Sequence, residues 1–466
     1  MLAKWDEERD VIVVGSGLAG LAAAIEAAQA GCSVTVLEKM KGYGGNSTIS
    51  DGYMAVAGSD MQIQAGIDDS PQRMAHDMTK AGLGLNHPDL VNIIAEQSAN
   101  TFTWVRDYLG VRFQDRVGQF GGHSVARAHT TLNRSGADII KQQLIKAAEN
   151  NVAIRTRTYL ESILKNDQGI VRGVQARQGY TYPDNTSGEA IHIKARKAVI
   201  LAAGGFGNDI AFRSAQDPRL DESIDSTNKY SATGGALREA IRIGAMPVHL
   251  SWIQLGPWAC PDEKGYGVGP DFSSYIAFPY GIIVDPATGR RFINELADRK
   301  IRADAILDTG HPCICVADHK TLAVSGHDIS RALKKGVVKE FNDLGELAVA
   351  FDMPSNEFKD TVTRFNGSIA DGTDPEYGKP ILNDAAPLEH PPYFAMRLWP
   401  KVHYTMGGIL INTKAQVLDL NGLPIHGFFA AGEVTGGVHG ASRLGCCAIT
   451  DCLVFGRIAG GQAAKI

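Results

Sequence analysis

Apolar residues near the start of the chain predict two buried strands separated by a helix. Residues 10–15 form a short β-branched run that ends in glycine, and residues 33–38 form a second apolar run that ends in an acid. Runs of this length without polar alternation are typical of parallel strands that are covered on both faces. The small residues at 21–30 favour a helix that packs closely on such strands.

Three glycines fill the turn between the first strand and this helix. Gly15, Gly17 and Gly20 have the spacing Gly-x-Gly-x-x-Gly, and Glu38 lies 18 residues further on. The first glycine permits a tight turn, the second lets the backbone approach a pyrophosphate, and the third lets the helix approach the strand. The helix N-terminus can hold phosphates, and the acid can accept hydrogen bonds from ribose hydroxyls. The pattern therefore predicts a dinucleotide-binding unit; the alternative is a glycine-rich turn that binds no nucleotide.

Two more strand-to-glycine transitions occur downstream, at residues 198–205 and 427–433. Both predict central strands whose carboxyl ends bear glycines, where open α/β sheets bind their ligands. Between them the chain changes character. Gly-, Pro- and aromatic-rich sequence continues to about residue 290 and is followed by short amphipathic helices, such as one at 360–366. We expect an inserted cap domain there and a nucleotide domain that is discontinuous in sequence.

Composition and charge narrow the class of protein. The 466 residues include 46 Lys and Arg against 51 Asp and Glu, which gives a formal net charge of −5. With 44% hydrophobic and 21% charged residues, wholesale disorder is excluded and two or three folded units are expected. The absence of a basic run argues against nucleic acid, and no apolar stretch is long enough to span a membrane. Residues 1–9 are polar, with no apolar signal core, so the expected location is the cytoplasm.

The seven cysteines are few and odd in number, which fits reduced thiols better than a disulfide framework. Cys313 with Cys315, and the adjacent pair Cys446 and Cys447, could be redox-active, but buried small side chains are the favoured interpretation. There is no Cys-x-x-Cys motif, so neither an attached c-type haem nor an iron–sulfur cluster is expected, and no metal site is predicted.

Several longer motifs occur in order along the whole chain. They are Gly-Tyr-Gly-Gly-Asn-Ser at 42–47, Ala-Ala-Gly-Gly-Phe at 202–206, Arg-Phe-Ile-Asn-Glu at 291–295, His-Tyr-Thr-Met-Gly-Gly at 403–408, and the Gly- and Ala-rich segment 431–445. Together they make the chain resemble the flavoprotein family of FAD-dependent fumarate reductases and flavocytochrome c, including its urocanate- and cinnamate-type 2-enoate reductases. The resemblance implies an α/β fold with a discontinuous, glutathione-reductase-like, Rossmann-type FAD-binding domain at 1–253 and 386–466. It also implies an α+β capping domain inserted at 254–385.

The resemblance also assigns the cofactor, FAD, and the residues that contact it. By position these are Gly15, Gly17, Ala19, Gly20, Glu38, Lys39, Gly45, Asn46, Ser47, Asp51, Gly52, Gly204, Tyr404, Glu433, Ala448 and Ile449. The histidine that links FAD covalently in membrane-bound relatives is not evident in residues 44–48, so we expect non-covalent FAD. The helix that begins near Gly445 would direct its positive N-terminal dipole at the flavin and stabilise the reduced anion.

The same resemblance implies a reaction, in which a hydride from flavin N5 adds to the β-carbon of an alkene and a proton adds to its α-carbon. Arg443 and His403 match residues that hold the substrate carboxylate, and Arg299 matches the proton donor. Cations at the carboxylate stabilise the developing enolate charge. Arginine is a weak acid, so neighbouring positive charge would be needed to acidify it. The alternatives are that Arg299 forms a surface ion pair near Asp298 and that His403 is structural; for His439 the structural interpretation is favoured.

Departures from the family pattern argue against fumarate as substrate. Gly256 stands where fumarate reductases carry the histidine that binds a second carboxylate, and residues 274–278 lack the Glu and Arg of a proton-relay segment. An unpaired buried carboxylate would cost several kcal/mol. The expected substrate is therefore a 2-enoate with an apolar or aromatic substituent. Its predicted binding residues are His403, Arg443, Gly52, Trp258, Tyr275 and Phe278. The alternative for the aromatic residues is that they pack a domain junction.

Two other functions remain open. A 3-ketosteroid-type FAD dehydrogenase would use a tyrosine acid–base pair, with Tyr275, Tyr280 or Tyr404 as candidates. An electron-transfer flavoprotein subunit of a larger complex would have no substrate of its own. With no haem motif in the sequence, the enzyme hypothesis requires an external electron donor, such as a reduced flavin, an NAD(P)H-linked reductase or a cytochrome.

Overall fold

The computed structural model describes residues 4–466, which form two compact units. The first three residues of the polar N-terminal segment lie outside the described residues. The larger unit comprises the chain up to Arg219, Lys229–Ile253 and Tyr404–Ile466, and the smaller unit comprises Leu220–Asn228 and Gln254–His403. Within two strands, β11 (Ile253–Gly256) and β17 (Lys401–Thr405), the chain passes from one unit to the other.

The return to the larger unit comes later in the sequence than the expected residue 386. Strand β16 (Tyr393–Leu398) pairs in antiparallel fashion with β14 (Cys313–Asp318) along its whole length. Residues 386–403 therefore belong to the smaller unit, and β16 is part of its five-stranded sheet, whereas β17 pairs with β11 in a separate two-stranded sheet.

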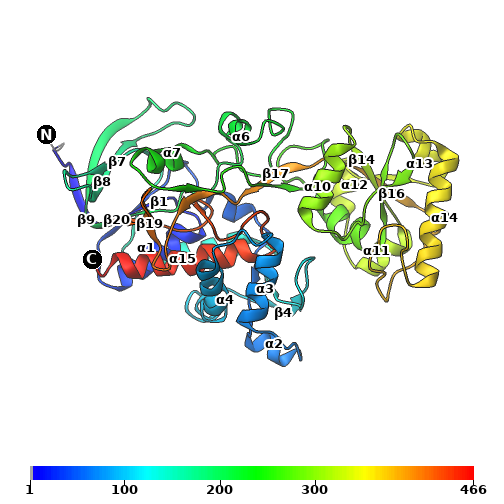
Figure 1. Cartoon of the computed structure of the whole chain (residues 1–466), viewed down its shortest axis with the longest axis horizontal. Coiled ribbons are helices and arrows are strands. Elements are labelled where there is room, and N and C mark those ends of the chain that lie inside the picture. Colours follow the sequence, from blue (N-terminus) through cyan, green and yellow to red (C-terminus); the bar gives the residue numbers. More distant parts are fainter. Residues whose placement is uncertain (1–3) are drawn as a thin grey trace. The chain divides into compact units, whose positions relative to one another are not determined.

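The larger unit is built on an eight-stranded sheet with a parallel centre (Figure 1). Its parallel strands, in spatial order, are β20 (Pro424–Ala430), β9 (Glu189–Leu201), β1 (Glu7–Val14), β2 (Val34–Leu37) and β6 (Ala153–Arg155). Antiparallel strands β19 (Gln416–Leu418), β8 (Val171–Gln178) and β7 (Thr158–Lys165) extend it. The four central strands predicted from sequence are confirmed as β1, β2, β9 and β20.

Two helices pack side by side against this sheet, α1 (Leu18–Gln29) and α15 (Cys447–Ala463, red in Figure 1). Small residues allow a very close approach. A Cβ at Gly456 would lie 2.5 Å from the backbone oxygen of Ala19, and one at Gly460 would lie 2.2 Å from that of Ala23. The small-residue composition that predicted α1 therefore serves a helix–helix contact as well as a helix–sheet contact.

The remaining elements of the larger unit surround this core. The helices are α2 (Asp60–Gln64), α3 (Pro71–Ala81), α4 (Pro88–Thr103, followed by a π-helical turn at Trp104–Tyr108), α5 (Gly136–Glu149), α6 (Ile210–Gln216) and α7 (Gly235–Arg242). Two small sheets contain β3 (Tyr53–Ala55), β5 (Ala128–Thr131) and β4 (Phe113–Gly118), and β10 (Pro247–Val248), β18 (Gly408–Leu410) and β21 (Thr435–Gly436).

The smaller unit is an α+β structure, as predicted, and the structure shows that it is built around an antiparallel five-stranded sheet. Its strand order is β13 (Arg290–Arg291), β12 (Ile282–Asp285), β14, β16 and β15 (Lys339–Phe341). Its helices are α8 (Gly269–Phe272), a π-helical turn at Ser273–Ala277, α9 (Phe278–Tyr280), α10 (Arg299–Asp308), α11 (His319–Ser325), α12 (Ser330–Lys334), α13 (Leu344–Ala350) and α14 (Ser355–Asp371).

Alternating strand residues divide the core of the smaller unit into two apolar clusters. Ile283 and Cys315 pack with Ile306 of α10, whereas Val284 and Ile314 pack with α13 and α14. Because successive strand side chains point to opposite faces, the helices cover both faces of this sheet. Helix α14, yellow in Figure 1, extends well beyond the predicted 360–366 at both ends.

Candidate active site

The glycine turn after β1 has a backbone that only glycine allows. Gly15 has φ +107°, and a Cβ there would lie 2.2 Å from the backbone oxygen of Ala202 at the end of β9. A Cβ at Gly20 would lie 2.0 Å from the backbone oxygen of Gly15. Larger residues would therefore push α1 away from the carboxyl ends of β1 and β9.

Glu38 is fixed beside this turn at the end of β2. It is buried, and it accepts hydrogen bonds from the Ser16 hydroxyl (2.6 Å) and the Met40 N–H (2.8 Å). Helix α1 begins after Gly17, which has no side chain to cap it; the Leu18 N–H donates to Ser47, and the N–H groups that follow it in the first turn can bind a phosphate. Glu38, the glycine turn and the N-terminus of α1 together fit the ADP part of FAD.

Other predicted FAD residues line open or tightly packed turns of the larger unit. Added Cβ atoms at Gly45 (φ +48°) and Gly204 (φ +77°) meet no protein atom within 4 Å, which leaves space for a ligand against the backbone. At Gly52 (φ +69°), next to Asp51, an added Cβ would lie 2.4 Å from the Thr131 hydroxyl, so this turn is closed by packing.

Polar side chains hold the segment that follows β2. Ser47 accepts a hydrogen bond from the Leu18 N–H (3.2 Å), and Asn46 accepts one from the Lys229 N–H (2.8 Å). The Lys39 ammonium donates to the Thr233 hydroxyl (2.9 Å), and burial lowers the pKa of Lys39 to about 8. Hydrogen bonds thus tie this segment to α1 and to residues 229–233.

Tyr404, Glu433 and Arg443 form a second group in the larger unit. The Arg443 guanidinium carbon lies 4.7 Å from the centre of the buried Tyr404 ring. Glu433 accepts a hydrogen bond from the Thr405 N–H (2.9 Å), and burial raises the pKa of Glu433 to about 7. Close by in sequence, His439 pairs with Asp451 (3.2 Å), which supports its structural role.

Helix α15 begins at Cys447, two residues after the predicted position. Cys446, which precedes it, has the left-handed φ of 64°, and no side chain caps the helix. The first-turn N–H groups, which include those of Ala448 and Ile449, can therefore face a ligand.

In the smaller unit, an indole ring lies between two predicted catalytic residues. The Arg299 guanidinium carbon lies 4.7 Å from the centre of the Trp258 ring. The Trp258 and His403 rings meet edge to face, with centroids 5.0 Å apart and an interplanar angle of 81°. The Trp258 Nε1–H is buried and has no hydrogen-bond partner among the described residues. The structure therefore brings Arg299, Trp258 and His403 together, while Arg443 belongs to the larger unit.

Neighbouring groups orient this cluster. The Thr227 hydroxyl lies 2.9 Å from His403 Nδ1 and also donates to the Val402 carbonyl (3.3 Å). Arg299 donates to the Gln254 side-chain oxygen (3.5 Å). Sequence reasoning missed Thr227 and Gln254, because neither belongs to a motif whose chemistry is evident before folding.

Arg299 is the first residue of α10, and Arg302 follows one turn later. Arg302 lies over the Phe278 ring at 4.6 Å, and burial together with the positive charge of Arg299 lowers the pKa of Arg302 to about 10. The i, i+3 spacing of two arginines was the sequence signal for this pair, and it was missed. Asp298 caps the helix by accepting from the Lys300 N–H (2.8 Å).

The other two predicted aromatic residues also belong to the smaller unit, and Phe278 packs in the same apolar cluster as Trp258. Phe278 is buried in its core beneath Arg302, which favours the packing interpretation of this residue. Tyr275 stacks on His327, with centroids 4.5 Å apart. Glu295 is fully buried and paired with Arg291 (2.8 Å).

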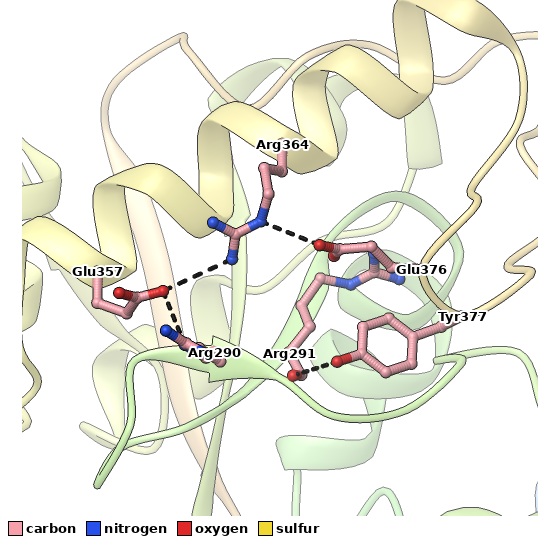
Figure 2. Close-up of a pocket in the computed structure, with 6 residues that line it drawn as sticks. All are labelled: Arg290, Arg291, Glu357, Arg364, Glu376 and Tyr377. Atoms are coloured by element: carbon pink, nitrogen blue, oxygen red, sulfur yellow. Dashed lines mark hydrogen bonds and ion pairs between the residues drawn. The ribbon is translucent and has the colours of Figure 1, made fainter.

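A cavity of about 220 Å³ in the smaller unit is lined by a network of paired charges (Figure 2). Arg364 donates to Glu376 (3.0 Å), Arg290 donates to Glu357 (2.8 Å), and the Tyr377 hydroxyl donates to the Arg291 carbonyl. Because these glutamates already neutralise Arg290 and Arg364, the cavity gives no support for a second substrate site.

None of the seven cysteines, all of which lie within residues 4–466, forms a disulfide bond. Among residues 4–466, no group of three or more His, Cys, Asp or Glu side chains is placed to hold a metal ion. In the same described range, no helix has the length and apolar character needed to cross a lipid bilayer.

Comparison with known proteins identifies the family. The model of the family described as FAD binding domain matches residues 10–449. This chain belongs to that family. It is 41% identical to the acrylate reductase flavoprotein subunit of Shewanella woodyi, over 98% of this chain and 91% of the relative. It is 37% identical to the urocanate reductase of Eggerthella lenta, over 98% of this chain and 75% of the relative.

Solved structures show the same fold. An open flavocytochrome c3 fumarate reductase matches with a TM-score of 0.82 and 34% identity, over 99% of this chain and 79% of that one. A 3-ketosteroid dehydrogenase from Rhodococcus jostii matches with a TM-score of 0.81 over 100% of this chain and 99% of that one, but at 24% identity it is evidence of fold alone. The chain is thus an FAD-dependent oxidoreductase acting on CH–CH groups and related to fumarate reductases.

Proposed function

We propose that this protein reduces the activated C=C bond of a 2-enoate monocarboxylate, with the smaller unit acting as a capping domain. The observation that carries the proposal is the Arg299–Trp258–His403 cluster, which holds a guanidinium and an imidazole against one aromatic ring. The 41% identity to the acrylate reductase subunit supports a monocarboxylate.

Each residue of the proposed site has its own role in binding or proton transfer. Bound FAD supplies the electron pair as a hydride. His403 of the smaller unit and Arg443 of the larger unit are each assigned to carboxylate binding by their motifs, and the planar guanidinium of Arg443 suits two parallel hydrogen bonds to a carboxylate. Arg299 gives a proton to the α-carbon of the substrate. Trp258 keeps the Arg299 side chain in one position, since a guanidinium is attracted to the face of an indole ring.

The hydrogen bonds of Thr227 favour one form of His403. Because the Thr227 hydroxyl donates to the Val402 carbonyl, its oxygen accepts from His403 Nδ1–H. The ring then presents Nε2 to the substrate, and protonation there gives an imidazolium suited to a carboxylate. Thr227 is therefore a positioning residue for carboxylate binding.

Arg302 helps Arg299 to act as an acid. Burial and the positive charge of Arg299 together lower the pKa of Arg302, so the two guanidinium groups are close enough to repel each other. Because this repulsion is mutual, the charge of Arg302 favours release of a proton by Arg299. Arg302 thus provides the neighbouring positive charge that an arginine acid requires.

The surroundings of Gly256 favour a substrate with one carboxylate. A Cβ at Gly256 would lie 3.0 Å from the Trp258 indole, so the aromatic ring fills the space beside this glycine. An apolar wall there favours an uncharged β-substituent, since a second carboxylate would lose hydration without gaining a partner. Since Trp258 and Phe278 are both buried in one apolar cluster, the space beside Gly256 is limited, and we expect small 2-enoates such as acrylate to be preferred over bulky aromatic ones.

The steroid dehydrogenase alternative is weakened by its candidate tyrosines. Burial raises the pKa of Tyr404 well above its ordinary value, and burial together with Asp384 raises that of Tyr280. Both shifts disfavour the phenolate that a tyrosine base must form. An external electron donor remains part of the proposal.

The decisive experiment is anaerobic. Flavin in the purified enzyme is photoreduced and then mixed with acrylate, crotonate, urocanate, cinnamate, fumarate or a ketosteroid, and its reoxidation is recorded. We expect rapid reoxidation by a monocarboxylate, loss of this reaction in Arg299→Ala with flavin retained, and unchanged rates in Arg290→Ala, an exposed arginine of the same unit. Reoxidation by the ketosteroid alone, or full activity of Arg299→Ala, would refute the proposal.

A further inference from the structure

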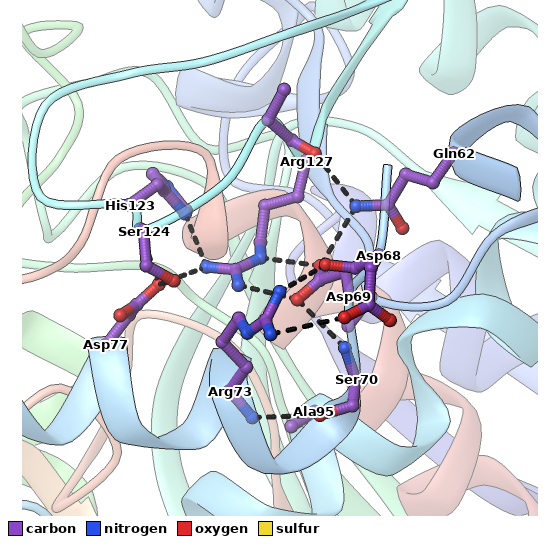
Figure 3. A network of polar contacts seen from close by, with 12 residues as sticks. Gln62, Asp68, Asp69, Ser70, Arg73, Asp77, Ala95, His123, Ser124 and Arg127 are labelled. Carbon is purple, nitrogen blue, oxygen red and sulfur yellow. Dashed lines mark hydrogen bonds and ion pairs between the residues drawn. The ribbon is translucent and has the colours of Figure 1, made fainter. Parts of the chain in front are cut away.

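A buried ionic network in the larger unit lies outside the predicted catalytic groups (Figure 3). At its centre is Arg127, whose side chain is fully buried. Its Nε and Nη2 donate to Asp69 (2.9 and 2.7 Å), and its Nη1 donates to Asp77 (2.5 Å) and to His123 Nδ1 (3.0 Å). Two carboxylates and one imidazole thus surround a single guanidinium.

Both carboxylates are ionised. Burial opposes ionisation, but hydrogen bonds from Arg127 and Gln62 hold the pKa of Asp69 below its ordinary value. For Asp77, burial is likewise outweighed by hydrogen bonds from Ser124 and Arg127, so its pKa is also lowered. A charged, paired network of this kind is rigid, because loss of any member would leave a buried charge uncompensated.

The two neighbours of His123 fix its tautomer. Arg127 is a donor only, so Nδ1 of the imidazole must accept. Nε2 lies 2.8 Å from the Gly445 carbonyl oxygen, which can only accept, so Nε2 carries the hydrogen. His123 is therefore neutral, with Arg127 on one side and the backbone that leads into α15 on the other.

The backbone that receives this hydrogen bond is the strained turn before α15. Cys446 has φ 64°, a conformation that costs a non-glycine residue about 1–2 kcal/mol. Three successive carbonyls of this turn each accept a hydrogen bond. Arg443 donates to that of Leu444 (3.2 Å), His123 to that of Gly445, and the Ala55 N–H to that of Cys446 (3.1 Å).

We propose that His123 and Arg127 are positioning residues that hold the Gly445 carbonyl, and with it the turn that aims the N-terminus of α15 at the flavin. The same turn carries Arg443, whose contact with substrate rests on the proposed function. Without the hydrogen bond from His123, the strained peptide would relax, and the uncapped N–H groups of α15 would turn away from the flavin.

Three substitutions of one residue test this. In His123→Gln the amide reaches as far as Nε2, so it can donate to Gly445 and accept from Arg127. In His123→Asn the amide oxygen still accepts from Arg127, but the shorter side chain cannot reach Gly445. His123→Leu removes both contacts, and His76→Leu, at an exposed histidine of α3, is the matched control.

The measurements are the dissociation constant of FAD and the midpoint potential of the bound flavin in the purified enzyme. We expect His123→Asn and His123→Leu to bind FAD about tenfold more weakly and to have a more negative potential, since the helix dipole stabilises reduced flavin. His123→Gln and His76→Leu should match the wild type.

A folded His123→Asn with unchanged affinity and potential would overturn the proposal, as would a His123→Gln variant that behaves like His123→Asn. Neither measurement involves a substrate. The outcome is therefore independent of whether the proposed enoate reduction is correct.

Discussion

Two neighbouring glycines of α15 provide a paired test of how closely this helix packs on α1. A Cβ at Gly460 would lie 2.2 Å from the backbone oxygen of Ala23, whereas a Cβ at Gly461 would meet no atom within 4 Å. Both residues lie inside the helix, so alanine improves helix propensity equally at both positions.

The expected changes in unfolding free energy have opposite signs. Gly461→Ala should stabilise the protein by about 1 kcal/mol through propensity alone. Gly460→Ala gains the same amount but forces two backbones apart, since real Cβ atoms essentially never lie within 3.0 Å of such an atom. Overpacking of this kind costs roughly 1–3 kcal/mol, and the cost lies at the upper end because a backbone oxygen cannot rotate away. The difference between the two variants equals this packing cost.

Urea unfolding of the FAD-loaded enzyme, followed by flavin fluorescence, measures both variants under one condition. Because α1 carries the glycine turn, Gly460→Ala should also weaken FAD binding, while Gly461→Ala should leave it unchanged. If Gly460→Ala is as stable as Gly461→Ala, the conclusion that α1 and α15 pack too closely to admit a Cβ at residue 460 is refuted.

Two further predictions concern buried charges. Burial raises the pKa of Glu433 from 4.5 to about 7, so the folded state holds a proton that the unfolded chain releases, and stability falls as the pH rises between these values. A pKa difference of one unit corresponds to about 1.4 kcal/mol of unfolding free energy. Flavin-free Glu433→Gln should therefore be roughly 3 kcal/mol more stable than the wild type above pH 7 and equal to it near pH 4. Urea unfolding at several pH values measures this, and parallel pH profiles of the two proteins would contradict it. Arg302→Met should slow alkene reduction about tenfold and raise the solvent deuterium isotope effect. Arg302→Lys, which keeps the charge, should retain most of the rate in stopped-flow measurements. Equal rates in both variants would show that the charge of Arg302 is not used.

The central strands and α1 of the larger unit could be predicted because local pattern determines them. Buried parallel strands read as unbroken apolar runs, and the glycines at 15, 17 and 20 are required by backbone geometry wherever this turn occurs. The second boundary between the units could not be read in the same way. The apolar run Tyr393–Leu398 is compatible with either sheet, and only its pairing with β14 assigns it to the smaller unit.

In the candidate site, too, some residues could be predicted from local motifs, whereas their neighbours could be found only from the tertiary structure. Arg299, His403 and Arg443 were named from motifs, and Trp258 from the aromatic character of its segment. The place of Trp258 between Arg299 and His403 depends on contacts between segments far apart in sequence, as do the neighbours Thr227 and Gln254. Phe278 is buried in the apolar cluster that also contains Trp258, and an aromatic residue has the same apolar signature in a pocket wall and in a core, so the sequence alone does not separate these two settings.

By itself, the sequence determined the nucleotide-binding framework, the family and the FAD cofactor, and it supplied the charged residues of the proposed site, since these depend on short motifs with strict backbone or chemical requirements. The tertiary structure decided which groups tune and hold them. Arg302 beside Arg299, and His123 between Arg127 and the Gly445 carbonyl, are ordinary residues in the sequence. They acquire a role only when folding removes water and brings their charges and hydrogen-bonding groups within a few ångströms of one another.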